Sequence, residues 1–308
     1  MEYTPKKYIV TGGAGFIGSH VVDALIARGD EVHVVDNFLS GKHERVNPKA
    51  IVHEVDIREF EKLPPIFKGA VGVFHLAAQP RMQYSIKEPR LTNDINITGT
   101  LNVLLAARDA QVKRVVYSAS SSAYGTSHPM PLREDMEARP VIPYAIQKRV
   151  GEQYCEMVAR FYGVETVAIR YFNVYGPRQT TGADGPYATV IGIFLEQAKN
   201  GQPMTVVPDG TQRRDFTHVY DTARANLLAM ESLKVGKGEI INIGTATNYS
   251  VLEVADMIGG KWEFGEARQG ETKETFADNS KAKELLGWEP KVTFEEGMAE
   301  LKKLNGLA

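Results

Sequence analysis

The chain has 308 residues and a formal net charge of −2, and 43% of its residues are hydrophobic and 24% charged. This length and apolar content suffice for a large core in one or two domains. The near-neutral charge, without a basic run, gives no electrostatic basis for binding nucleic acid or an anionic membrane.

Compartment and metal content follow from a few further features. A single cysteine, Cys155, excludes an intramolecular disulfide and a cysteine-rich metal site, so we expect no metal centre. No apolar run is long enough to span a bilayer, and the first seven residues lack the apolar segment of a signal peptide. We therefore expect a cytoplasmic protein that has no membrane partner.

Residues 8–26 combine a short β-branched strand, a glycine cluster and an amphipathic helix. Gly12, Gly15 and Gly18 would permit a tight turn and a close approach of the backbone to a pyrophosphate at the helix N-terminus. Such a triplet alone also fits an ordinary glycine turn. The next expected strand, 31–35, ends in Asp36, where a carboxylate would bind the ribose diol of NAD and repel the 2′-phosphate of NADP. This order of elements predicts an NAD site.

The following segments add candidates for the adenosine half of that site. The polar loop after Asp36 could lie against the adenosine, and a strand at 51–55 ends in Asp56 and Ile57, a hydrogen-bond acceptor and an apolar surface for adenine. The small residues that end the apolar stretch 72–79 would leave space beside a ligand. His75, inside that stretch, is predicted to be a hydrogen-bonded core histidine rather than a catalytic base.

A helix is expected over 89–110, with Asn96 as a polar group on a packing surface. A strand at 113–118 follows and leads into a serine cluster around Ser120. Ligands of parallel α/β sheets bind at the carboxyl ends of strands, so these hydroxyls should face the cofactor, although a serine cluster also suits an ordinary turn.

Tyr144 and Lys148 enter a long helix that continues through Phe161. A spacing of four residues places them on one helical face, one turn apart. An ammonium beside a phenol, together with a positive nicotinamide, would lower the pKa of the tyrosine from about 10 toward neutrality. Behind a dinucleotide motif and the Ser120 cluster, the pair indicates a general base rather than a chance surface pair.

The rest of the chain is less regular. A strand at 164–170 and a polar loop at 171–178 precede a helix at 188–200, a strand at 204–207, a helix at 221–233, a strand at 239–243, and helices at 252–258, 281–286 and 294–304. The fold class predicted is α/β, a doubly wound Rossmann-type parallel sheet with a smaller, mixed α/β C-terminal substrate lobe. We place the NAD-binding domain at 1–173, with some later segments returning to it, and the substrate lobe mainly at 174–308.

These ordered motifs resemble those of the extended short-chain dehydrogenase/reductase family, and within it the nucleotide-sugar 4-epimerases of the UDP-glucose 4-epimerase type. The resemblance runs from Tyr8 to about Leu301 and includes the stretches 213–216, 241–244 and 285–288. It implies a tightly held NAD and a 4-keto sugar intermediate. It also implies a homodimer, in which helices containing 101–105 and 150–161 form a four-helix bundle, although both apolar faces could instead be buried internally.

The resemblance assigns roles residue by residue. It implies Ser120, Tyr144 and Lys148 as the catalytic triad. It implies, as the cofactor site, Gly12, Gly15, Phe16, Ile17, Gly18, Asp36, Asn37, Ser40, Gly41, Asp56, Ile57, Leu76, Ala77, Ala78, Asn96, Ser118, Tyr144, Lys148 and Phe172. It implies, as the nucleotide-sugar site, Ser120, Tyr144, Asn173, Val190, Thr205, Val207, Arg214, Arg268, Glu271 and Thr275. A guanidinium suits a diphosphate and a carboxylate suits a ribose diol.

The function that the resemblance implies is an NAD-dependent 4-epimerase of UDP-glucose and UDP-galactose. Small Thr275 stands where a bulky tyrosine would restrict the 2-substituent, so N-acetylhexosamines are expected to fit. Related 4,6-dehydratases carry Thr-Asp-Glu where this chain has Ser120-Ser121-Ser122, so dehydration is disfavoured. Decarboxylating relatives carry a glutamate in the same segment, and its absence here disfavours decarboxylation.

Other readings remain open. A UDP-glucuronate 4-epimerase, or another enzyme of this family that modifies nucleotide sugars, is the main alternative. A non-catalytic NAD sensor would tend to lose the tyrosine or lysine, and a simple dehydrogenase would accumulate a ketone. This chain has Val207 and Pro208 where relatives usually carry an aromatic residue and a glycine beside the base. A base other than uracil therefore stays open.

Overall fold

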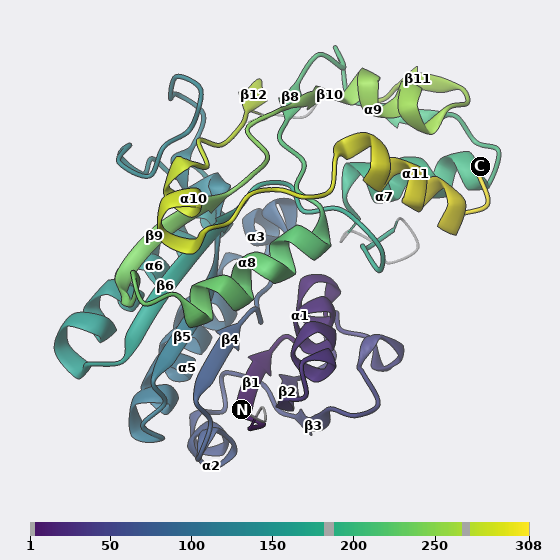
Figure 1. Ribbon diagram of the computed structural model, residues 1–308. Coiled ribbons are helices and arrows are strands. Elements are labelled where there is room, and N and C mark those ends of the chain that lie inside the picture. Colours follow the sequence, from purple (N-terminus) through teal and green to yellow (C-terminus); the bar gives the residue numbers. More distant parts are fainter. Residues whose placement is uncertain (1–3, 182–187, 267–271, 308) are drawn as a thin grey trace.

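A seven-stranded parallel sheet forms the centre of the protein in its computed structural model, which describes residues 4–181, 188–266 and 272–307 (Figure 1). The strand order is β3-β2-β1-β4-β5-β6-β9, with every neighbouring pair parallel. The strands are β1 Lys7–Thr11, β2 Glu31–Asp36, β3 Ile51–Glu54, β4 Gly72–His75, β5 Arg114–Ser120, β6 Glu165–Tyr171 and β9 Lys237–Ile243. The reversal of strand order beside β1 creates the crevice in which such sheets bind ligands.

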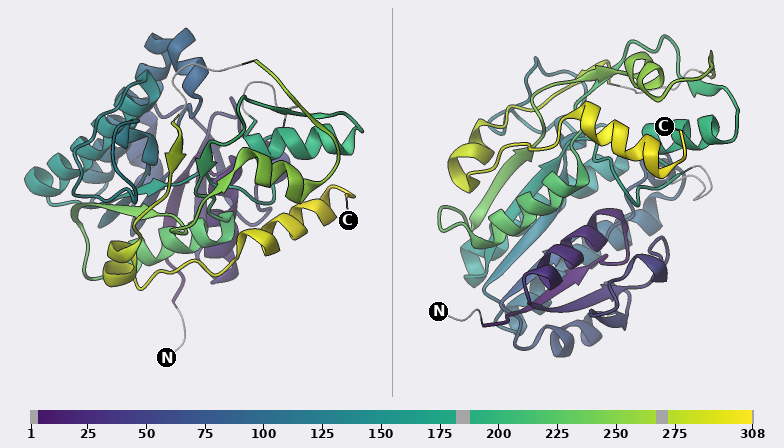
Figure 2. Two further views of the ribbon diagram at one scale, coloured as in Figure 1. Left: turned by 90° about the horizontal axis from the view of Figure 1, so that it is seen from above. Right: turned by 45° about the vertical axis from the view of Figure 1, so that its right-hand side comes forward.

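Helices cover both faces of this sheet (Figures 1 and 2), so its central strands are almost continuously apolar. Alternate residues of β1 face opposite cores: Val10 packs with one face and Ile9 with the other. The first face is covered by α1 Phe16–Ala27, α8 Val219–Glu231 and α10 Ser280–Leu286, and the second by α2 Leu63–Phe67, α5 Gly99–Asp109 and α6 Pro143–Tyr162.

The helix expected over residues 89–110 is divided. It consists of α4 Pro89–Asn93, a π-helical segment at Asp94–Thr98, and α5. A π turn changes the direction in which the following side chains point, and the helical spacing of apolar residues does not reveal this change. The apolar patterns of the sequence also did not predict several short elements: α3 Met82–Lys87, α2, and the 3₁₀ turns η1 His43–Arg45, η2 Phe60–Lys62 and η4 Ser121–Tyr124.

A smaller lobe lies above the large sheet in the view of Figure 1. Its helices are α7 Val190–Lys199, α9 Val251–Ile258 and α11 Phe294–Leu304. Its strands form two small sheets: β7 Met204–Val206 with β11 Trp262–Phe264, and β8 Arg213–Arg214 between β10 Tyr249–Ser250 and β12 Glu274–Thr275. The lobe has its own apolar core around Phe194, Val254 and Phe294. Strand β9 and helix α8 come from beyond residue 173 yet belong to the large sheet and its cover.

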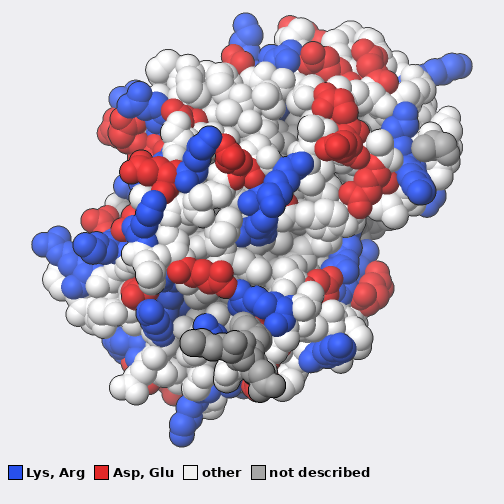
Figure 3. Space-filling view, viewed as in Figure 1, with Lys and Arg blue, Asp and Glu red and all other residues white. Residues whose placement is uncertain are grey.

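Charged side chains are mixed on the surface. On the face seen in Figure 3, Lys and Arg are interspersed with Asp and Glu, and uncharged areas lie between them. None of the helices in the described ranges is long and apolar enough to cross a membrane.

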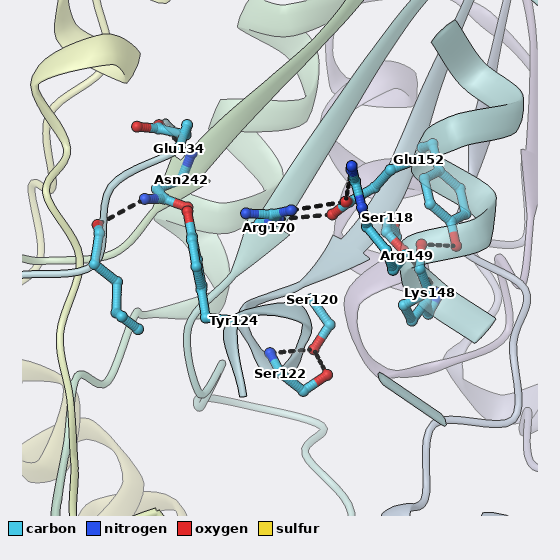
Figure 4. Close-up of polar contacts among 12 residues, drawn as sticks. Ser118, Ser120, Ser122, Tyr124, Glu134, Lys148, Arg149, Glu152, Arg170 and Asn242 are labelled. Carbon is cyan, nitrogen blue, oxygen red and sulfur yellow. Dashed lines mark hydrogen bonds and ion pairs between the residues drawn. The ribbon is translucent and has the colours of Figure 1, made fainter. Parts of the chain in front are cut away.

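A buried ion pair joins α6 to the sheet. Arg170 on β6 donates from Nε and Nη2 to the two carboxylate oxygens of Glu152 on α6, at 2.7 and 2.8 Å, and each residue is 1% exposed. Arg149, one turn before, donates to the same carboxylate at 3.0 Å. The guanidinium of Arg170 also lies 4.3 Å from the ring centroid of Tyr124. Figure 4 shows this network beside the serine cluster.

The network extends to β9 through Tyr124, whose hydroxyl donates to Asn242 Oδ1 at 2.7 Å. Asn242 Nδ2 then donates to the backbone carbonyl of Leu132 at 2.9 Å (Figure 4). Helix α6, strands β6 and β9 and the turn after β5 are thereby held together by one set of buried polar contacts.

Loss of the Glu152 charge should destabilise the fold, because Arg170 would remain buried without its counter-charge. We expect Glu152→Gln to lower the free energy of unfolding by about 3 to 5 kcal/mol, measured by urea denaturation followed by circular dichroism. Glu156→Gln, an exposed position on the same helix, should change it by less than about 0.5 kcal/mol. Equal stability of the two variants would contradict this prediction.

Candidate active site

A cavity of about 660 Å³ opens at the carboxyl ends of the parallel strands, and residues of the small lobe form part of its wall. Its size is within the range of small-molecule and cofactor sites. Most positions proposed from the sequence lie on its wall: Gly12, Gly15, Phe16, Ile17, Gly18, Asp36, Asn37, Ser40, Gly41, Asp56, Ile57, Leu76, Ala77, Ala78, Ser118, Ser120, Tyr144, Lys148, Asn173, Val190, Arg214 and Thr275.

Four other proposed positions lie away from this wall. Asn96 is buried in the π-helical segment, where it bonds the backbone of Gln79. Phe172 packs in a separate apolar cluster with Tyr124. Thr205 is exposed on β7 and Val207 follows that strand. Arg268 and Glu271 lie outside the described residues.

The glycine loop between β1 and α1 leaves no room for side chains. Gly12 has φ +71°, and a Cβ there would lie 2.6 Å from the backbone nitrogen of Ala77. A Cβ on Gly18 would lie 2.1 Å from the carbonyl oxygen of Gly12. Within the described residues, no side chain caps the start of α1, and its first residues, Phe16 to Gly18, line the cavity. This helix N-terminus, with its unsatisfied N–H groups, fits the pyrophosphate of a dinucleotide.

Asp36 closes β2 at the edge of the same loop. Its two carboxylate oxygens accept from the backbone N–H groups of Ala14, at 3.0 Å, and Phe38, at 2.9 Å. Burial raises the pKa of Asp36, while these two hydrogen bonds act to lower it. The loop after it comes close, since a Cβ on Gly41 would lie 2.8 Å from Asp36 Oδ1. A held carboxylate at this point of the wall fits the ribose diol of NAD.

Around Asp56, where the sequence predicts the adenine, the wall of the cavity carries hydrogen-bonded polar side chains. Arg58 donates to both oxygens of Asp56, at 2.9 and 2.7 Å, and Asn37 donates to one of them at 2.7 Å. The hydrogen bond from Arg58 is the main cause that lowers the pKa of Asp56 to about 2, so this carboxyl is ionised at neutral pH. Together with the glycine loop and Asp36, these wall residues fit NAD as the bound cofactor.

Tyr144 and Lys148 start helix α6 and face the end of β5. Burial raises the pKa of Tyr144 to about 12, and a hydrogen bond with Ser120 and the charge of Arg81 act to lower it. Burial lowers the pKa of Lys148 to about 8. The Lys148 ammonium donates to the carbonyl oxygen of Ser118 at 2.7 Å, and Figure 4 labels both residues. The same ammonium lies 5.0 Å from the Tyr117 ring centroid. In the protein by itself, desolvation dominates the pKa of Tyr144. The lowering of this pKa by Lys148 together with a bound nicotinamide stays a prediction.

Ser120 is held at the junction of β5 and η4. Its hydroxyl lies 2.9 Å from that of Ser122 and accepts from the Ser122 backbone N–H at 3.2 Å (Figure 4). The side chains of Ser120 and Tyr144 meet at the wall of the cavity, which gives two hydroxyls that could share one substrate oxygen.

His75 is buried in β4 and bonded on both ring nitrogens. Nδ1 lies 2.7 Å from Thr11 Oγ1 and Nε2 lies 3.0 Å from Thr100 Oγ1. Burial lowers its pKa to about 3, so the ring stays neutral. This environment is that of a hydrogen-bonded core histidine.

The small lobe meets the cavity around Asp215. This buried carboxylate accepts from Thr245 at 2.8 Å and from the backbone N–H of Ala277 at 3.0 Å, and burial raises its pKa to about 6. The backbone carbonyl of Asp215 accepts from Asn173 at 2.9 Å. Asp215 thus sets the position of Asn173 and of β8, which carries Arg214.

Sequence reasoning missed further residues of the wall. Arg45, Gln79, Arg81, Thr189 and Phe216 all line the cavity. One feature of the sequence could have indicated Arg81: it is a cation that directly follows the small residues at the end of the β4 stretch. The others come from loops whose approach to the cavity depends on packing of distant elements. In the described ranges, no group of three or more His, Cys, Asp or Glu side chains could hold a metal ion.

Replacing Asp36 should change the choice between NAD and NADP. In Asp36→Ser, the repulsion of the 2′-phosphate is lost, so the ratio of the NADP to the NAD dissociation constant should fall at least about tenfold, or about 1.4 kcal/mol. Isothermal titration calorimetry of nucleotide-depleted protein with each cofactor measures the ratio. An unchanged ratio would show that Asp36 does not contact the ribose.

Comparisons with known proteins agree with this geometry. Residues 8–244 match the model of the NAD dependent epimerase/dehydratase family. A putative UDP-glucose 4-epimerase of Methanocaldococcus jannaschii is 40% identical over 298 residues, which are 94% of this chain and 95% of the relative.

Solved structures give the same result. UDP-glucose 4-epimerase of Thermotoga maritima, crystallised with UDP-glucose, is 40% identical with a TM-score of 0.92, over 96% of this chain and 97% of that chain. UDP-glucose 4-epimerase of Thermus thermophilus, in complex with NAD, is 33% identical with a TM-score of 0.88, over 96% and 99% of the two chains. Because the family model spans most of the chain and these relatives cover nearly all of it, the chain belongs to the NAD dependent epimerase/dehydratase family, within the extended short-chain dehydrogenases/reductases.

Proposed function

We propose that the protein is a 4-epimerase of UDP-hexoses that interconverts UDP-glucose and UDP-galactose and also accepts their N-acetylhexosamine forms. The observation that carries this proposal is the position of Tyr144 and Ser120 in one cavity, between the glycine loop and the small-lobe residues Asn173 and Arg214. The relatives with UDP-glucose and with NAD support it.

The chain's own residues supply binding and proton transfer. NAD, which the glycine loop and Asp36 would hold, would supply the hydride-transfer chemistry at sugar C4. Tyr144 takes the proton of the 4-hydroxyl and later returns it, while Ser120 hydrogen-bonds the same oxygen. Lys148 is assigned to the cofactor ribose, and its donation to the Ser118 carbonyl orients its side chain.

Two features of the wall support epimerisation of a range of sugars. Ser120, Ser121 and Ser122 all line the cavity, so no carboxylate at these positions can drive elimination of water. Thr275 lines the cavity from β12, and we assign to its small side chain the tolerance of a 2-substituent. Arg214, on the neighbouring strand β8, is assigned to the diphosphate.

The activity test uses purified protein without added cofactor, with UDP-galactose, UDP-N-acetylgalactosamine and UDP-glucuronic acid in separate reactions followed by proton NMR. We expect the matching gluco sugar from the first two, up to a fixed equilibrium ratio and without net NADH. Turnover of UDP-galactose alone would contradict the role of Thr275. Turnover of UDP-glucuronic acid alone would replace the proposal by the uronate alternative. Accumulation of a ketone would show that the protein is a simple dehydrogenase.

Tyr144→Phe should reduce kcat by about 10² to 10⁴-fold, the usual contribution of a positioned acid–base group, while NAD binding is retained. Tyr162→Phe, at the exposed end of the same helix, is the matched control and should keep full activity. If Tyr144→Phe kept more than a tenth of kcat, Tyr144 would not be the base.

We also propose a homodimer that associates through α5 and α6. Ile146, Phe161 and Tyr162 of α6 are 45%, 69% and 44% exposed, so this helix presents apolar side chains to the surface. Sedimentation velocity should give a species of twice the 34.0 kDa chain mass, and Phe161→Glu with Ile146→Glu should shift it toward the monomer. A monomer in the unmodified protein would refute the proposal.

A further inference from the structure

Helix α6 carries a buried glutamine between the two side chains to which we assign proton transfer and cofactor binding. Gln147 lies three residues after Tyr144 and directly before Lys148, and it is 2% exposed. A buried amide is costly unless its polar atoms have partners. The partners of Gln147 come from the stretch between β4 and β5. Asn96 Nδ2 donates to Gln147 Oε1 at 2.8 Å, and Gln147 Nε2 donates to Thr92 Oγ1 at 3.0 Å.

Asn96 extends this contact to the wall of the cavity. Its Oδ1 accepts from the backbone N–H of Gln79 at 2.7 Å, and its Nδ2 also donates to the backbone carbonyl of Gln79 at 3.0 Å. Gln79 follows Ala77 and Ala78 on the cavity wall. Ala77 in turn lies against the glycine loop, since a Cβ on Gly12 would lie 2.6 Å from its backbone nitrogen. One asparagine therefore ties the loop after β4 to helix α6.

The hydrogen bonds of this chain of contacts run in one direction. The backbone N–H of Gln79 can only donate, so Asn96 turns its oxygen toward it and uses its amide nitrogen for the Gln79 carbonyl and for Gln147. Gln147 then accepts with its oxygen and donates with its nitrogen to Thr92, whose hydroxyl donates to the carbonyl of Glu88 at 3.1 Å. Loss of one member leaves a buried donor or acceptor without its partner.

The same stretch caps the start of α6. The N-cap residue, Ile142, has no polar side-chain atom, and Pro143 has no N–H. Ser85 of α3 provides the acceptor instead: its Oγ accepts from the backbone N–H of Tyr144 at 3.1 Å, at a helix position that N-cap side chains normally bind. Ser85 is fully buried. Tyr144 and Gln147 are thus held by side chains of one stretch, residues 85–96.

Packing alone does not require polar groups at these positions. Apolar side chains of the same shape would leave nothing unpaired and would cost little stability, whereas a fully paired buried network makes the elements that it joins rigid. Asn96 also lies in the π-helical segment Asp94–Thr98, and π turns inside helices occur frequently at functional sites. These features favour a role in holding geometry over a role in stability alone.

We propose that Gln147 is a positioning residue for the reaction. Through Asn96, it holds the start of α6, and with it Tyr144 and Lys148, at a fixed position against the loop 77–79 of the cavity wall. A displacement of about 1 Å can cost about 10²-fold in rate, because reacting groups must meet in a narrow range of geometries. The effect on turnover rests on the proposed function, whereas the effect on the loop does not.

The kinetic test is Gln147→Met, which keeps the length of the side chain and removes both hydrogen bonds. At saturating NAD we expect kcat for UDP-galactose to fall by about ten- to a hundredfold. The KM for the sugar nucleotide should be unchanged, because Arg214 and Thr275, on β8 and β12, take no part in this chain of contacts. Gln153→Met, at an exposed position of the same helix, is the matched control and should keep full activity.

Two further variants separate positioning from a general disturbance of α6. Gln147→Glu should retain more activity than Gln147→Met, because burial favours a protonated carboxyl, which can accept from Asn96 and donate to Thr92. Thr92→Val combined with Gln147→Met should lose no more kcat than Gln147→Met alone, since both changes remove the same hydrogen bond. Losses that multiply would contradict a shared contact.

Hydrogen exchange gives a readout that does not depend on the reaction. In ¹⁵N-labelled, NAD-saturated protein, Gln147→Met should speed exchange of the Gln79 backbone N–H on the order of fivefold, the equivalent of one hydrogen bond. Gln153→Met should leave this rate unchanged. The measurement reports directly whether Gln147 holds the loop through Asn96, because Gln79 has its backbone bonds to Asn96 and not to Gln147.

Two results would overturn the inference: an unchanged Gln79 exchange rate in Gln147→Met, or an unchanged kcat per folded molecule, which a contact that serves stability alone would give. A fall of kcat in Gln153→Met as large as in Gln147→Met would also overturn it. If the unmodified protein epimerises no UDP-hexose, the proposed function fails, and hydrogen exchange still decides whether Gln147 positions the loop.

Discussion

The bidentate ion pair between Arg170 and Glu152 is the contact on which the geometry of the catalytic end depends. It fixes α6, which carries Tyr144 and Lys148, to the central strand β6. Through Tyr124 and Asn242 it also fixes the turn that follows Ser120. Tyr144 and Ser120, which we propose to act on one substrate oxygen, thus derive their positions from a single buried network. Such a network stabilises the fold only when each of its polar groups is paired.

Burial is the main physical influence on the ionisable groups of the site. It raises the pKa of Tyr144, lowers that of Lys148 and keeps His75 neutral. Each shift disfavours a charge in a low-dielectric environment. A tyrosine proposed as a base in such a place needs nearby positive charge, which the nicotinamide of bound NAD would supply.

The two parts of the molecule divide the task. The parallel sheet presents the glycine loop, Asp36 and Asp56 along one side of the cavity, as suits a dinucleotide. The small lobe presents Arg214 and Thr275 from two paired strands on the other side. Asp215 organises the lobe at this boundary, because its buried carboxylate accepts hydrogen bonds from two separate loops. The cavity exists only where these parts meet.

The sequence by itself determined the features that depend on neighbouring residues. Glycine spacing predicted the loop between β1 and α1, the spacing of Tyr144 and Lys148 placed both on one helix, and apolar patterns located the strands of the large sheet. These follow from local sterics and periodicity. Tertiary structure alone decided that Asn96 and Phe172 are buried away from the cavity, that desolvation dominates the pKa of Tyr144, and that β9 completes the sheet. Those outcomes depend on packing and desolvation between segments far apart in the chain, which no local pattern encodes.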